Sequence, residues 1–252
     1  LEFAAQHGGD WRYVAGWNKW FGYDGEGWRE DKIERVDRLA LEFCRSAANW
    51  PEARVLTPDG RRKIGQRRTA FNVRDAARND WQISSGVEQC NANDYLVGVP
   101  GGVFDVETGK LIEGEREHYV TKRCKVAPAS GRPSRWLEHL LRMYDGDESM
   151  LEWTRLYFGY CATGAVNEQV FGFWYGMGQT GKGTTLLTVA ELLGDYAVSS
   201  EASTWLKRNN EKHLSEMAAF NGARMIVVDE MPSGAAWNEE RTDDHSMTFQ
   251  SC

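Results

Sequence analysis

A glycine-rich segment between a predicted buried strand and a predicted helix constrains this chain more than any other feature. It spans residues 171–185 and reads FGFWYGMGQTGKGTT. Glycine permits backbone angles and a close approach that a β-carbon would block, so successive amide groups can point at phosphate oxygens. Lys182 stands at the helix N-terminus, where its ammonium group can reach β- and γ-phosphates and the helix dipole favours anions. The segment therefore predicts a site for a nucleoside triphosphate.

The segment matches the P-loop pattern G-x-x-x-x-G-K-[ST] at every position but the last. Gly183 stands where the magnesium-binding hydroxyl belongs. Thr184 comes one residue later, about 100° further round the helix, where we expect its hydroxyl to meet the α-phosphate rather than the metal. A glycine-rich turn with a chance lysine is the alternative, but the strand and helix on either side favour the nucleotide site. The residues expected to bind the nucleotide are Gly176, Met177, Gly178, Gln179, Thr180, Gly181, Lys182, Gly183 and Thr184.

A second predicted strand ends in two acids. Residues 224–230 read RMIVVDE, with four consecutive apolar residues before Asp229 and Glu230. A central parallel strand has this composition because helices cover both of its faces. Ligands bind at the carboxyl ends of such strands, so Asp229 could hold magnesium and Glu230 could polarise an attacking water. An ordinary strand capped by solvated acids would read the same, but the position 47 residues after Lys182 leaves room for the elements of an NTPase core.

A linker is predicted at residues 127–133, APASGRP, which are small and framed by prolines. The sequence predicts a smaller mixed α+β accessory domain over residues 1–130. It predicts an α/β domain over residues 131–252, with an incomplete parallel sheet of the P-loop NTPase type.

Local patterns predict the elements of both domains. The accessory domain should contain helices within residues 31–48 and 51–80, with a turn at residues 57–60, and short strands within residues 95–111. The second domain should begin with amphipathic helices near residues 134–144 and 148–161. Asp147 is the expected N-cap of the second of these helices.

Composition indicates a cytoplasmic protein. No apolar stretch approaches membrane-spanning length, and the first residues lack the basic-then-apolar design of a signal peptide. The five cysteines are scattered without a C-x-x-C pair, which predicts reduced thiols rather than disulfides or a zinc site. A net charge of −7 excludes coating of nucleic acid by bulk electrostatics, so any contact with DNA must be local.

Two local features could contact DNA. Residues 61–68, RRKIGQRR, form a basic run that is either a phosphate-contacting patch or a solvated helix paired with nearby acids such as Asp75. Seven aromatic residues lie between Trp11 and Trp28 and could stack on bases. Residues 24–27, DGEG, predict a hairpin loop between them, and core packing is the favoured role for these aromatics.

Segments of both predicted domains resemble a known family. Residues 159–164, GYCATG, then Glu168 and the segment 171–182 are similar to the ATPase of phage and plasmid primase-helicases of helicase superfamily 3. Residues 94–111, followed by Tyr119-Val120-Thr121, resemble the poxvirus-type primase-helicase N-terminal domain. Residues 220–224, FNGAR, precede the strand that ends in Asp229 and Glu230, as the corresponding segment does in these proteins. The resemblance runs from about Trp11 to Glu240.

The resemblance implies ATP and Mg²⁺ as cofactors, DNA, single-stranded or forked, as partner, and a ring of subunits, commonly a hexamer, for the intact protein. It implies coupling of ATP hydrolysis to DNA unwinding, with Lys182 and Glu230 as catalytic residues. Residues 241–252, RTDDHSMTFQSC, lack the family's Thr-Gly-Gly-Asp segment, sensor and arginine finger, so the chain is expected to be truncated near residue 241 and to bind nucleotide better than it hydrolyses it. Two alternatives stay open: an ATP-dependent replication scaffold or DNA-binding protein without unwinding activity, and another P-loop motor such as a packaging ATPase.

Overall fold

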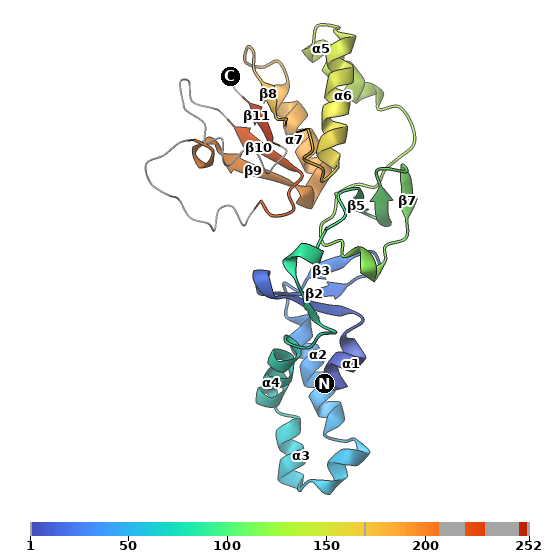
Figure 1. Ribbon diagram of the computed structural model, residues 1–252, viewed down its shortest axis with the longest axis vertical. Helices are drawn as coiled ribbons and strands as arrows, with labels where there is room; N and C mark the ends of the chain where they lie inside the picture. Colours follow the sequence, from blue (N-terminus) through green and yellow to red (C-terminus); the bar gives the residue numbers. More distant parts are fainter. Residues whose placement is uncertain (1, 169, 207–219, 230–246, 251–252) are drawn as a thin grey trace. The chain divides into compact units, whose positions relative to one another are not determined.

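The computed structural model describes residues 2–168, 170–206, 220–229 and 247–250, with the backbone alone for Asp229 and for the last segment. The fold mixes helices with several small sheets (Figure 1). Backbone contacts divide it into one unit of Leu1–Ala92 with Glu115–Thr121 and another of Asn93–Gly114 with Lys122–Cys252. The domain boundary at residue 130 stays a prediction.

The first unit is α+β, as predicted. Its sheet has the order β3-β2-β1-β4, antiparallel except for the parallel pair β1 and β4. The strands are β1 (Trp11–Val14), β2 (Lys19–Tyr23), β3 (Trp28–Glu30) and β4 (Ser84–Ser85). The helices are α1 (Glu2–His7), α2 (Arg35–Ala47), α3 (Pro58–Ile64) and α4 (Arg67–Ala77).

The predicted hairpin at residues 24–27 is confirmed. Asp24 closes it, because its Oδ1 accepts hydrogen bonds from the backbone amides of Glu26 and Gly27, each at 2.9 Å. The aromatic residues beside the hairpin are core rather than a stacking surface, since Trp20, Phe21 and Trp28 are all buried. This result agrees with the packing role that the sequence favoured.

The predicted turn at residues 57–60 is instead the first turn of α3. Thr57 is the N-cap, and its Oγ1 accepts a hydrogen bond from the amide of Gly60 at 3.1 Å. Pro58 occupies the first helical position, where its fixed φ suits the helix and its missing N–H costs nothing. The same residue types favour turns and helix starts, so the local pattern alone did not separate the two.

The second unit contains two sheets. The strands predicted within residues 95–111 form a small antiparallel sheet of β5 (Leu96–Val99), β6 (Gly102–Asp105) and β7 (Lys110–Ile112). A second sheet, in which every pair is parallel, has the order β8-β11-β10-β9. Its strands are β8 (Gly172–Trp174), β9 (Ala197–Glu201), β10 (Met225–Asp229) and β11 (Met247–Gln250).

The α-helices of the second unit begin near the predicted positions. They are α5 (Ser134–Met143), α6 (Glu148–Ala162) and α7 (Lys182–Leu193). Asp147 caps α6 as predicted, since its Oδ1 accepts from the amides of Ser149 and Met150. Short 3₁₀ helices join the elements of the two units: η1 (Ala15–Trp17), η2 (Pro51–Val55), η3 (Val87–Gln89), η4 (Arg116–His118), η5 (Gly194–Tyr196) and η6 (Ala202–Thr204).

The prediction that β10 is buried on both faces is confirmed. Met225 and Val227 join a cluster that includes Leu186 of α7, whereas Ile226 and Val228 join a second cluster around Trp205. Successive side chains of a strand point to opposite faces, so a run of four apolar residues is explained by a hydrophobic cluster on each side.

Arg224 ties the start of β10 to three other elements of the second unit. Its guanidinium is buried and donates to the carbonyl oxygens of Ala162 at 2.9 Å and Leu96 at 2.7 Å. It also lies 4.5 Å from the ring centre of Tyr196. Burial lowers the pKa of Arg224, an effect that Tyr196 and Asp94 oppose. The arginine thus joins the end of α6, β5 and η5 at one point.

Arg224→Met should therefore destabilise the second unit. The substitution keeps a long side chain but leaves the part-buried carbonyl oxygens of Ala162 and Leu96 without this donor, at a cost of up to about 1–3 kcal/mol for each unsatisfied group. Hydrogen–deuterium exchange of the β5 and β10 amides should become faster. Arg155→Met is the matched control, because Arg155 is exposed and pairs with Glu152 on its own helix. Equal exchange in the two variants would contradict this role.

Candidate nucleotide-binding site

The turn between β8 and α7 depends on glycine at two positions. Gly176 has φ +140° and Gly181 has φ +98°, both in the region that L side chains rarely adopt. A β-carbon at Gly181 would also lie 2.8 Å from Cε1 of His139. A β-carbon at Gly178 would have no atom within 4 Å, so this conformation has room for a side chain at position 178.

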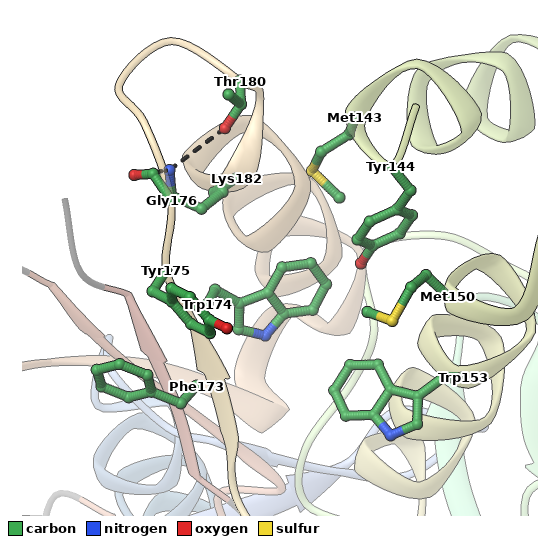
Figure 2. Close-up of a pocket in the computed structure, with 10 residues that line it drawn as sticks. All are labelled: Met143, Tyr144, Met150, Trp153, Phe173, Trp174, Tyr175, Gly176, Thr180 and Lys182. Atoms are coloured by element: carbon green, nitrogen blue, oxygen red, sulfur yellow. Dashed lines mark hydrogen bonds between the residues drawn. The ribbon is translucent and has the colours of Figure 1, made fainter. Parts of the chain in front are cut away.

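Lys182 is buried at the end of this turn, and its ammonium group contacts only neutral oxygens in the described part of the chain (Figure 2). Nζ donates to the carbonyl oxygens of Gly176 at 3.0 Å and Met177 at 2.9 Å, and to Oγ1 of Thr180 at 3.3 Å. A buried charge without a partner of opposite sign is unfavourable. The arrangement is suited to an anion that enters the turn and takes over these contacts.

The N-terminus of α7 adds to the attraction for anions. The first amide groups of a helix have no partner within it, and the helix dipole is positive at this end. Gly183 is the second residue of α7, and Thr184 is exposed beside it. The nine residues expected to bind the nucleotide therefore form one continuous turn and helix start, and their contact with nucleotide stays a prediction.

Thr185 and His139 support this turn, and sequence reasoning missed both. Oγ1 of Thr185 donates to the carbonyl oxygen of Gly181 at 3.0 Å and lies 2.9 Å from Nε2 of His139. The contact joins α5 to the start of α7 across 46 residues of sequence. The one local signal is that Thr185 comes four residues after Gly181, because the hydroxyl of a helical threonine often bonds to the carbonyl four residues earlier.

An apolar pocket of about 550 Å³ lies beside Lys182, and sequence reasoning also missed it. In Figure 2, Trp153 of α6 faces Trp174 on one side of β8, while Phe173 and Tyr175 project from the other side. The ring of Phe158 also stacks on Trp174, with the two ring centroids 5.6 Å apart. The lining residues are Met143, Tyr144, Met150, Trp153, Phe173, Trp174, Tyr175, Gly176, Thr180 and Lys182.

The hydroxyl of Tyr144 does not add a polar contact to this lining. It lies 2.6 Å from Oγ1 of Thr154, a fully buried residue, and burial raises the pKa of Tyr144. The pocket thus presents rings and thioethers, with Thr180 and Lys182 as its polar end.

The strand register places the backbone of Asp229 at the same sheet edge as the turn. Val228 pairs with Phe249, and Phe249 pairs with Phe173, so Asp229 is level with Trp174 two strands away. At about 4.8 Å per strand this is a separation of roughly 10 Å between backbones. The Asp229 side chain and all of Glu230 lie outside the described residues, so their roles as metal ligand and water activator stay predictions.

Comparison with known families identifies the first part of the chain. The model of the family described as D5 N terminal like matches residues 2–153, more than half of the sequence. The chain belongs to this family. D5 N-terminal-like domains form the N-terminal part of D5-like primase-helicases of phages and viruses, so the family associates the chain with DNA replication. The turn with Lys182 lies beyond the matched residues.

No curated protein matches this sequence. Among the residues that the structure describes, no helix is long and apolar enough to cross a lipid bilayer.

The helical backbone at Gly183 makes Gly183→Ser a direct test of the magnesium position. A serine there restores the usual hydroxyl without strain, because residue 183 lies within α7 rather than in a left-handed conformation. We expect magnesium-dependent binding of ATP to become tighter in isothermal titration calorimetry. Thr184→Ala should leave the magnesium dependence unchanged. A large loss of magnesium dependence in Thr184→Ala would make Thr184 the metal ligand instead.

Proposed function

We propose that this chain is the ATP-binding part of a replicative primase-helicase and that the complete protein couples ATP hydrolysis to DNA unwinding. The observation that carries the proposal is the buried Lys182 ammonium, held by neutral oxygens at the end of a glycine turn that opens a helix. Membership of the D5 N-terminal-like family supports a role in replication over a packaging motor.

The groups present fit a bound triphosphate. Lys182 would hold the β- and γ-phosphates, and the turn of residues 176–181 would surround them with backbone amides. Asp229, at the same sheet edge by register, is the proposed ligand of magnesium, and Glu230 the residue that orients water. Magnesium would supply charge neutralisation on the phosphate oxygens. A ring of subunits is part of the proposal, since such motors complete each site with an arginine from a neighbour.

The apolar pocket extends this proposal to the nucleobase. Base rings stack favourably on aromatic side chains, and Trp153 offers a partly exposed ring near the polar end formed by Lys182 and Thr180. Few polar groups line the pocket, so recognition of the base would depend on stacking more than on hydrogen bonds.

Lys182→Ala should weaken ATP binding by about tenfold to more than a hundredfold. Loss of the charge-assisted contact to phosphate corresponds to about 1.5–3 kcal/mol. We would titrate a fluorescent ATP analogue against the wild type and the variant, with circular dichroism as the check on folding. Unchanged affinity in a folded variant would remove the nucleotide site from this account.

Trp153→Ala should separate base binding from phosphate binding. The affinity for ATP should fall roughly fivefold or more, because a stacking contact contributes about 1 kcal/mol. Displacement of bound nucleotide by inorganic tripolyphosphate should show an unchanged affinity for the tripolyphosphate. Trp81→Ala is the matched control, since Trp81 is also exposed and belongs to the first unit. If Trp153→Ala weakens both ligands equally, the pocket does not hold the base.

A helicase and a scaffold differ in turnover. An ATPase assay with and without single-stranded DNA distinguishes them, because a motor is stimulated by its track and a nucleotide-dependent scaffold is not.

A further inference from the structure

The helices of the first unit carry a charge opposite to that of the whole chain. Residues 35–78 contain eleven Lys or Arg and five Asp or Glu, a net charge of +6, whereas the chain has −7. The segment includes α2, α3 and α4, which pack against one another. The positive charge is therefore concentrated on one compact group of helices rather than diluted by the acidic remainder.

Ion pairs between α2 and α4 neutralise part of this charge. Arg74 pairs with Asp37 and Asp75, at 2.5 and 2.8 Å, and Arg78 lies 3.4 Å from Asp75. These contacts join α2 to α4 and account for two of the five acids.

The basic residues of α3 share a single acid. Asp59 lies 2.6 Å from Nη2 of Arg62 and 2.9 Å from Nζ of Lys63. Arg61, on the same helix, has no carboxylate at ion-pair distance in the described part of the chain. Arg45, near the end of α2, has none there either. Arg45 and Arg61 are therefore guanidinium groups without a negative partner among the described residues.

Both of these groups line one hollow. It has a volume of about 380 Å³ and lies between the end of α2 and α3, and we call it the arginine hollow. Its lining residues are Arg45, Ala48, Asn49, Arg61, Arg62 and Gly65. Three arginines from two helices thus line this space, and none of its lining residues carries a carboxylate.

Neutralisation of the α2 dipole explains only part of this arrangement. A cation near a helix C-terminus is favourable, and Arg45 lies in the last turn of α2. Arg61 and Arg62, however, come from a different helix and add repulsion between like charges at the same place. An anion in the hollow removes this repulsion. Guanidinium groups bind phosphate oxygens through parallel N–H donors, which makes phosphate the best-matched anion.

We propose that the arginine hollow binds the phosphate backbone of DNA, without regard to base sequence. The proposal deepens the DNA-related part of the proposed function and is independent of the nucleotide site around Lys182. Arg45 and Arg61 supply the free guanidinium groups, and Arg62 exchanges part of its contact with Asp59 for phosphate. The remainder of the chain has a net negative charge, which disfavours non-specific contact with DNA outside these helices.

The test is DNA binding by the full chain without nucleotide, measured by fluorescence anisotropy with a labelled single-stranded oligonucleotide over a range of salt. The double variant Arg45→Ala with Arg61→Ala should bind about tenfold more weakly. The slope of log affinity against log salt should decrease by roughly 1.4, since each lost phosphate contact on a single strand contributes about 0.7. Circular dichroism verifies that the double variant is folded.

The matched control is Arg132→Ala with Arg155→Ala, which changes the net charge equally at exposed positions outside the arginine hollow. It should bind DNA like the wild type. Arg45→Lys with Arg61→Lys should be intermediate, because the charge remains but the paired donors are lost. Lys182→Ala should bind DNA normally whether or not it binds ATP, which separates this proposal from the nucleotide site.

Three outcomes would overturn the proposal. These are a failure of the wild type to bind DNA, an equal loss of binding in the two alanine pairs, and competition by polyglutamate as strong as competition by unlabelled DNA. The last result would make the hollow a site for any polyanion, such as an acidic protein segment.

Discussion

The turn between β8 and α7 closes on the ammonium group of Lys182. Its contacts to two carbonyl oxygens and to Thr180 hold the turn together, and the backbone can follow this path only because residues 176 and 181 are glycines. The start of α7 is fixed in turn by Thr185, which is bonded to Gly181 and His139. The position of the apolar pocket depends on the same turn, since Lys182 and Thr180 form its polar end.

The buried and exposed cationic side chains of this protein differ in their contacts. Arg224 donates to two carbonyl oxygens and contacts an aromatic ring, so its charge serves to join elements of the second unit. Lys182 is equally buried, but its partners are loop carbonyls that a phosphate could replace. Arg45 is exposed and Arg61 partly exposed, and both line a hollow without a carboxylate in its lining. The degree of burial and the type of partner distinguish these roles, whereas residue type alone does not.

Local signals were predictable from the sequence, and long-range contacts were not. The Asp147 cap, the hairpin at Asp24 and the buried strand of residues 225–228 depend on patterns within a few residues, and all are confirmed. Thr57 was misjudged because turns and helix starts share their residue types. The contact between His139 and Thr185 and the pairing of Trp153 with Trp174 join segments far apart in the chain, so no local pattern contains them. Glu230 lies outside the described residues, and its role stays a prediction.

The most direct test of the central claim is a crystal structure of this chain with magnesium and a non-hydrolysable ATP analogue. The account predicts the triphosphate within the turn of residues 176–181, with Nζ of Lys182 moved from the carbonyl oxygen of Gly176 to the β- and γ-phosphates and the base against Trp153. It also predicts magnesium on the side of Asp229. A saturated complex in which the triphosphate lies elsewhere, while Lys182 keeps its contacts to Gly176 and Met177, would contradict it.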